Sequence, residues 1–140
     1  MSGQTLLFVY GTLRRGAGSL MGERLASEAT HVGDASVAGV LYDTGPFPAC
    51  VGTDDPSERV HGEVWAFRVD SADTLLAILD QYEGFAPDAR FGSLFLRDRV
   101  TVRFEDGSEQ EAWMYRYNMP PESAVRVPGG DWLRRDEAGD

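Results

Sequence analysis

Short apolar runs separated by turns rich in glycine and proline recur along the chain, a pattern typical of β-structure. The run Leu-Leu-Phe-Val-Tyr at 6–10 ends at Gly11, which predicts a buried strand. A second strand is predicted over 37–42, broken by Gly-Pro-Phe-Pro at 45–48. Alternation over 60–69 predicts a long strand.

Helical spacing is clearest after this strand, where apolar side chains recur three and four residues apart from Leu75 to Tyr82. Asp70 or Ser71 is suited to cap the start of this helix, and Gly84 to end it. We expect a shorter helix through residues 20–25, after a loop at 11–18. Residues 95–104 and 111–118 predict a hairpin whose turn lies at 105–108.

These elements amount to about six strands and one or two helices, and the strands are too scattered for a doubly wound sheet. We therefore predict an α+β fold, a small mixed β-barrel closed by a helix. The 140 residues, 42% of them hydrophobic, suit a single core. We expect one domain over 1–133, with the charged residues 134–140 as a flexible tail.

The charge of the chain argues against several classes of partner. The formal net charge is −10, and all 13 basic residues are arginine. Arg97, Arg99 and Arg103 alternate on one predicted strand, but acidic residues surround them, so we expect neither nucleic acid nor anionic membrane as a partner. A chain without lysine has no Schiff base, no P-loop lysine and no lysine general base.

Cysteine and histidine are too sparse to suggest redox or metal chemistry. The single cysteine, Cys50, has no partner for an internal disulfide, and no cysteine-protease signature joins it to His31 or His61. Two isolated histidines lack the spacing of metal ligands, so we expect no metal site and no cofactor. Without a secretory signal or a span of about 20 apolar residues, the expected location is cytoplasmic.

The turn after the first strand is a candidate anion-binding loop. At Gly11-Thr12-Leu13, consecutive backbone N–H groups could point at one carboxylate or oxyanion, and glycine allows the sharp turn. The alternative is an ordinary strand-to-helix connection. A nucleotide loop is excluded, because 11–22 lacks the Gly-Lys-Ser/Thr ending and Gly16-Ala17-Gly18 is not completed by a glycine at position 21.

Glu83 is the candidate acid/base. It lies in the last turn of the best-predicted helix, where the helix dipole disfavours a carboxylate, and Asp80 adds like charge one turn earlier. Partial burial beside Tyr82 and Phe85 would raise its pKa further toward neutrality. The alternative is a solvated glutamate at a helix end, without any chemical role.

Taken together, the two features resemble the γ-glutamyl cyclotransferase-like family. The motifs that carry the resemblance occur in order along nearly the whole chain: Tyr10-Gly11-Thr12-Leu13-Arg14, Gly39-Val40-Leu41-Tyr42-Asp43 with Phe47-Pro48-Ala49, Leu79-Asp80-Gln81-Tyr82-Glu83-Gly84, Arg97-x-x-Val100-x-Val102, Ala112-Trp113-Met114-Tyr115 and Gly130-Asp131-Trp132. The chain departs from many members at Phe95, where they carry tyrosine, and at Ser19, where they often place a larger polar residue.

This resemblance implies a barrel with one cavity and a cofactor-free reaction. The loop at Tyr10, Gly11, Thr12 and Leu13 would bind a γ-glutamyl group through its amides, and Glu83 would be the general acid/base. The substrate's own α-amine would attack its γ-carbonyl, releasing 5-oxoproline and an amine or peptide. Tyr115 either lines the cavity or packs in the core with its hydroxyl satisfied.

The expected partner is a small γ-glutamyl compound, bound by a monomer or homodimer. Glutathione, γ-glutamyl amino acids, a γ-glutamyl-lysine isopeptide and an antibiotic intermediate all present the same γ-glutamyl end. A non-catalytic module of the same fold, binding a small ligand or a partner, is the alternative. The occurrence of Glu83 together with the 10–14 turn in one sequence favours the enzyme.

Overall fold

The computed structural model describes residues 5–11, 13–14, 19–44, 48–67, 72–83, 95–118 and 124–134, with only the backbone of 72, 73, 82, 83 and 134. Its strands are β1 (Thr5–Val9), β2 (Ala29–Ala38), β3 (Val40–Asp43), β4 (Pro48–Val51), β5 (Arg59–Phe67), β6 (Phe95–Phe104), β7 (Glu109–Tyr117) and β8 (Val125–Arg126). Its helices are α1 (Leu20–Glu28), α2 (Ala72–Glu83) and a 3-10 helix at Trp132–Arg134.

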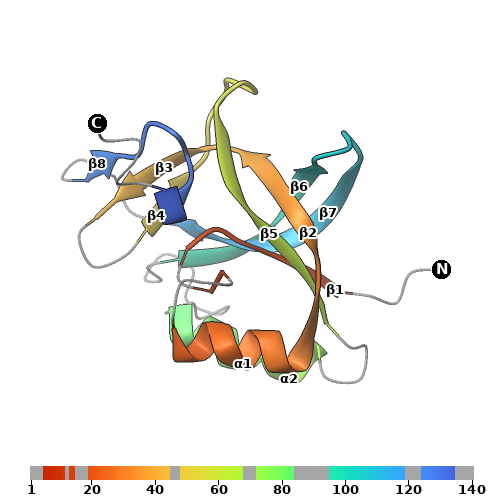
Figure 1. Ribbon diagram of the computed structural model, residues 1–140. Coiled ribbons are helices and arrows are strands. Elements are labelled where there is room, and N and C mark those ends of the chain that lie inside the picture. Colours follow the sequence, from red (N-terminus) through yellow and green to blue (C-terminus); the bar gives the residue numbers. More distant parts are fainter. Residues whose placement is uncertain are drawn as a thin grey trace.

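Five of these strands close into a barrel in the order β1-β5-β2-β6-β7. Neighbours pair antiparallel except where β1 meets β7 in parallel, at Leu7 opposite Trp113, so the barrel is mixed. The other strands form a three-stranded sheet, β4-β3-β8, beside it. The two α-helices lie together on one side of the barrel, away from this sheet (Figure 1). The predicted small mixed barrel is confirmed, with five strands in the barrel and three outside.

Alternate side chains of the strands enter two separate hydrophobic clusters. In β1, Leu7 and Val9 join the cluster that contains helix residues such as Leu25 and Leu79. Phe8, between them, joins the second cluster, which includes residues of the small sheet. The period of two along a strand therefore makes both faces of β1 apolar, which explains its uninterrupted apolar run.

Helix α1 begins at Leu20 and runs to Glu28, three residues beyond the stretch predicted as helix. Ser19 caps α1, with its Oγ accepting a hydrogen bond from the Gly22 N–H at 2.9 Å. Helix α2 ends at Glu83, as predicted, whereas the predicted caps Asp70, Ser71 and Gly84 lie outside the described residues. Within the described part of the chain, no helix is long and apolar enough to cross a membrane.

The strand predicted over 37–42 is wrong as a single element. Gly39 divides it, so that residues up to Ala38 belong to the barrel and residues from Val40 to the small sheet. The Gly39 N–H donates to the Glu58 carbonyl at 3.0 Å, and a Cβ here would come within 2.9 Å of Cys50 Sγ. At Gly39 the chain passes from the barrel to the small sheet. It packs so closely against β4 and the end of the 52–58 loop that only glycine fits there.

Candidate active site

Tyr10 connects the end of β1 to two other strands. Its hydroxyl donates to the Tyr115 carbonyl of β7 at 2.6 Å and accepts from the Cys50 N–H of β4 at 3.3 Å. The ring is buried in the second cluster. Tyr10, predicted to bind substrate, thus has its hydroxyl bonded to backbone, and it fixes the strand end from which the turn departs.

The turn itself is compact around Gly11. The Arg14 N–H donates to the Gly11 carbonyl at 3.1 Å, and a Cβ on Gly11 would overlap Pro48 Cγ. Leu13 is buried in the cluster shared with the helices. Of the three predicted amide donors, Gly11 and Leu13 are described and belong to this turn, whereas Thr12 lies outside the described residues.

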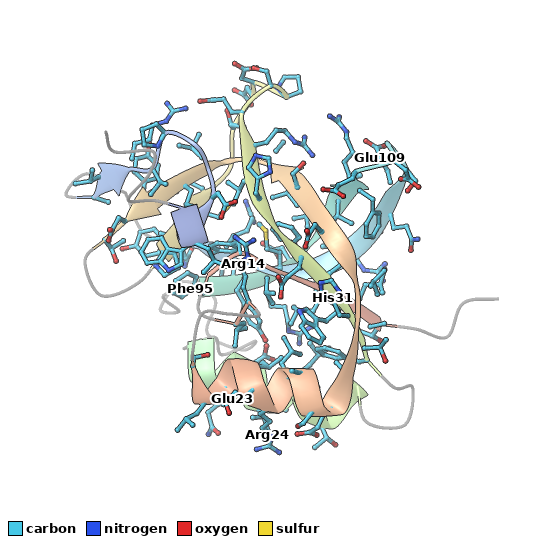
Figure 2. The ribbon with its side chains drawn as sticks, in the orientation of Figure 1. Arg14, Glu23, Arg24, His31, Phe95 and Glu109 are labelled. Atoms are coloured by element: carbon cyan, nitrogen blue, oxygen red, sulfur yellow. The ribbon has the colours of Figure 1, made fainter. Side chains whose placement is uncertain are left out.

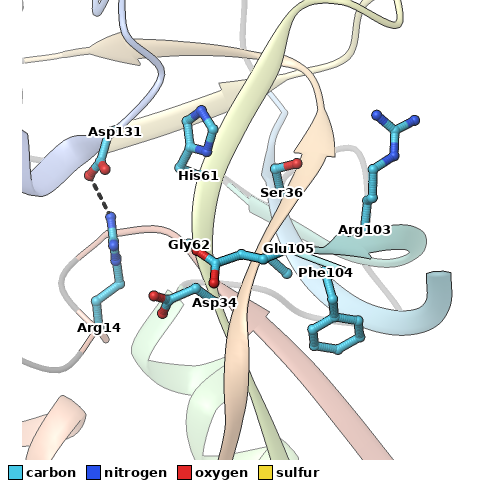
Figure 3. A pocket seen from close by; sticks show the side chains of 10 residues that line it. Arg14, Asp34, Ser36, His61, Gly62, Arg103, Phe104, Glu105 and Asp131 are labelled. Carbon is cyan, nitrogen blue, oxygen red and sulfur yellow. Dashed lines mark hydrogen bonds and ion pairs between the residues drawn. The ribbon is translucent and has the colours of Figure 1, made fainter. Parts of the chain in front are cut away.

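Arg14 fixes the far end of the turn. Its side chain, labelled in Figure 2, is 10% exposed, and Nη1 lies 2.7 Å from Asp131 Oδ1 (Figure 3). Nε lies 3.8 Å from Glu63 Oε2. Glu63, buried on β5, also accepts from the Trp65 indole N–H at 3.2 Å. The arginine therefore pairs with acidic neighbours and holds the turn against β5 and the C-terminal segment.

A second buried carboxylate, Asp80, lies in α2 one turn before Glu83. The Tyr115 hydroxyl donates to its Oδ1 at 2.7 Å. The Arg97 guanidinium donates to both carboxylate oxygens, from Nε to Oδ1 at 2.7 Å and from Nη2 to Oδ2 at 3.1 Å. Asp80 is 7% exposed and Tyr115 is 3% exposed, so this network lies inside the protein.

Tyr10 belongs to one core cluster, whereas Leu13 of the turn and Tyr115 of β7 belong to the other, together with Leu79 of α2 and Phe95 of β6. The side chain of Glu83 is not described, but its backbone ends the helix whose Leu79 packs there. Phe95 is itself buried, so its ring fills core space.

Beyond Arg14 and Asp131 lies an open hollow of about 560 Å³, also lined by His61, Arg103 and Glu105 (Figure 3). Both signs of charge line it. We assign it no role in the site.

One group of side chains has the composition of a metal site. Donor atoms of His31, Asp34 and Glu63 lie within 4.8 Å of one another. However, Glu63 already accepts from Trp65 and faces the permanent positive charge of Arg14, which opposes a second cation. We therefore assign no metal to this group.

Cys50 is buried, and burial raises the pKa of its thiol to about 12, despite the opposing charge of Arg116. A thiol with so high a pKa is not a nucleophile at neutral pH, because the thiolate is the reactive form. This agrees with the absence of a cysteine-protease signature around Cys50 in the sequence.

Sequence reasoning did not assign Glu63 or Arg97 a part in the site, and Asp80 entered only as a like charge beside Glu83. A signal for Glu63 was available: a lone carboxylate within the apolar stretch from Gly62 to Phe67. For Asp80 and Arg97 the partners lie far apart in the chain, and only the fold brings them together.

Comparison with known proteins finds a family match over most of the chain. Residues 7–134 match the family described as gamma-glutamyl cyclotransferase, AIG2-like. The chain is 33% identical over 132 residues to the gamma-glutamylcyclotransferase family protein ytfP of Citrobacter rodentium, covering 94% of this chain and 97% of that protein.

Solved structures share the fold. YkqA of Bacillus subtilis aligns with a TM-score of 0.69 at 23% identity, over 98% of this chain and 43% of YkqA, so the chain spans less than half of that protein. The AIG2-like protein of Mus musculus aligns with a TM-score of 0.64 at 22% identity, over 92% of this chain and 94% of that one. At these identities the structures establish only the fold. The match over residues 7–134 establishes the family: this chain belongs to the AIG2-like γ-glutamyl cyclotransferase family.

Proposed function

We propose that this protein is a γ-glutamyl cyclotransferase that releases 5-oxoproline from a γ-glutamyl amine or peptide. The observation that carries the proposal is the family match over 7–134, which includes both the 10–14 turn and the end of α2. The common packing of Leu13, Leu79 and Tyr115 supports a single site formed by these segments.

In the proposed reaction, the α-amine of the substrate attacks its own γ-carbonyl carbon. The new C–N bond closes a five-membered ring, and the old amide C–N bond breaks from the tetrahedral intermediate. Glu83 takes a proton from the α-ammonium group, and the amine so formed attacks. Glu83 then passes this proton to the departing nitrogen, and the second proton that the ring nitrogen loses goes to the released amine. The products are 5-oxoproline and the protonated amine, so atoms and charges balance without any added reagent.

The turn at 10–14 would supply the electrostatic half of catalysis. Backbone N–H groups of Gly11, Thr12 and Leu13 would stabilise the oxyanion, which is effective when the donors are held in place before reaction. The bonds of Tyr10 to two neighbouring strands and of Arg14 to the C-terminal segment support such rigidity. Because nucleophile and electrophile belong to one molecule, correct folding of the substrate contributes much of the rate.

Glu83→Gln tests the proposal. Glutamine keeps the size of the side chain but cannot move a proton, so turnover should fall by about 10²–10⁴-fold while the fold is retained. The measurement is 5-oxoproline formation from a panel of γ-glutamyl amines, amino acids and peptides, with circular dichroism as the check on folding.

Glu28→Gln is the matched control, because Glu28 ends α1 as Glu83 ends α2. It should leave turnover unchanged. A folded Glu83→Gln protein with normal turnover, or a wild-type protein that converts none of the panel, would contradict the proposal; the second result would favour the binding module.

A further inference from the structure

We propose that Asp80 is the positioning residue for Glu83: by joining the last turn of α2 to the β6–β7 hairpin, it sets the place and charge surroundings of the catalytic carboxyl. This inference rests on the proposed function, in which Glu83 moves the proton. Asp80 itself is not expected to touch substrate.

The geometry of the attachment is specific. Arg97 on β6 and Tyr115 on β7 lie directly opposite each other in the hairpin register, so their side chains leave the same face. Both reach the Asp80 carboxylate: the arginine by two hydrogen bonds of 2.7 and 3.1 Å, the tyrosine by one of 2.7 Å. Three bonds from two strands therefore meet on one residue of α2.

Stability alone is a weak reason for this network. The helix already packs on the barrel through Leu75 and Leu79, both fully buried. A buried ion pair gives little net stability over apolar residues of the same size, because both charges must leave water. A bidentate pair adds a fixed orientation, because the two N–H groups of the guanidinium donate to both carboxylate oxygens in one geometry. The network thus defines the rotation and depth of the last helical turn.

Glu83 follows Asp80 by three residues in the same helix, which places the two positions on one face. Among the side chains that the structure describes, the charged or titratable groups that contact Asp80 are Arg97 from β6 and Tyr115 from β7. Asp80 and Arg97 form an ion pair one helical turn before the position of Glu83. Removing one of the two leaves the charge of the other uncompensated.

The experiment measures kcat, KM and the pH profile of kcat/KM for D80N, R97Q and Y115F. In D80N the unpaired Arg97 charge favours ionised Glu83, so the acidic limb should move to lower pH by about 1 unit; in R97Q the unpaired Asp80 charge should move it upward by a similar amount. Y115F removes the hydrogen bond from the Tyr115 hydroxyl to Asp80 and leaves every charge in place. It should lower kcat by about 10-fold, with the limb and KM nearly unchanged.

D98N and R116Q are the matched controls. Asp98 and Arg116 form a 2.7 Å pair between the same two strands, and Asp98 alternates with Arg97 along β6, so it leaves the opposite face. These variants should keep the wild-type kcat and pH limb. Hydrogen exchange of the amides at 80–83 should be faster in Y115F than in either control, because one tether of the helix end is lost.

The outcomes separate the two proposals. Opposite shifts of the limb in D80N and R97Q, with a lower kcat in Y115F, support the role of Asp80. If the wild type is active and the three variants behave as the controls do, the role is overturned while the proposed function stands. Absence of cyclotransferase activity in the wild-type protein would contradict both the proposed function and the role of Asp80. Should D80N fail to fold, R97Q still provides the charge test and Y115F the geometric one.

Discussion

At the scale of single residues, Gly11 shows how a missing side chain can define a site. A Cβ at this position would overlap Pro48 Cγ at the start of β4. We predict that Gly11→Ala displaces the turn or β4, lowering kcat/KM by about 10-fold or more and the free energy of unfolding by about 1–3 kcal/mol. Activity assays and urea unfolding measure the two effects.

Gly52→Ala provides the comparison for Gly11. A Cβ at Gly52 would meet Arg116 Nη1 at 3.7 Å, an ordinary contact. Both quantities should stay close to wild type in this variant. Equal behaviour of the two alanine variants would show that the contact between Gly11 and Pro48 does not constrain the turn.

The buried thiol of Cys50 predicts that the protein loses stability at alkaline pH. Burial raises the pKa of its thiol from 9.0 to about 12, so between these values the unfolded chain loses the proton and the folded chain keeps it. The free energy of unfolding should therefore be unaffected by this thiol below pH 9, and should fall by about 1.4 kcal/mol per pH unit between pH 9 and 12. Urea unfolding of wild type and Cys50→Ala between pH 8 and 10.5 measures this, and parallel curves for the two proteins would refute it.

At the scale of elements, the β6–β7 hairpin has the clearest local cause. Gly107 has a φ of 88°, its N–H donates to the Phe104 carbonyl at 3.0 Å, and nothing lies within 4 Å of where its Cβ would be. Gly107→Ala should cost about 1–2 kcal/mol through backbone strain alone. Gly107→Asn should cost less, since asparagine tolerates a positive φ better. Thermal unfolding compares them; equal losses would exclude backbone strain as the cause.

Elements with such local signals could be predicted from the sequence. The hairpin and α2 appear within about two residues of their predicted bounds, because turn residues and helical periodicity are properties of a short segment. The first half of β2, from Ala29, was not predicted. Its side chains are alternately exposed and half-buried, and the register shifts between His31 and Gly33, so no continuous apolar pattern marks it.

The same distinction applies to the site. The 10–14 turn and Glu83 carry local signals, a glycine after an apolar strand and a carboxylate at a helix end. The groups that fix them do not: Asp80 meets Arg97 and Tyr115 across 17 and 35 residues of chain. Such pairs depend on strand order and register, which a single sequence does not specify locally.

At the scale of the whole molecule, the segment around Gly130 to Trp132 packs against β5 and the turn that follows β1. The Gly130 carbonyl accepts from the His61 N–H of β5 at 2.7 Å, and Gly130 has a φ of 66° with the Arg59 carbonyl where a Cβ would be. Trp132 is buried in the second cluster. Asp131, between them, is thereby held beside Arg14, 117 residues earlier in the chain.

A double-mutant cycle tests whether this contact joins the two ends energetically. The Arg14 side chain is 10% and that of Asp131 23% exposed, and their charged atoms lie 2.7 Å apart. Arg14→Gln, Asp131→Asn and the double variant, compared by urea unfolding, should give a coupling energy of about 0.5–3 kcal/mol. The exposed pair Arg24 and Glu28, also 2.7 Å apart, should give less, about 0.3–0.5 kcal/mol, because solvent screens it. If the 14–131 coupling is no larger than that of the surface pair, the C-terminal segment does not hold the turn through Arg14. In that case Tyr10 and the packing of Gly11 on Pro48 remain as its supports.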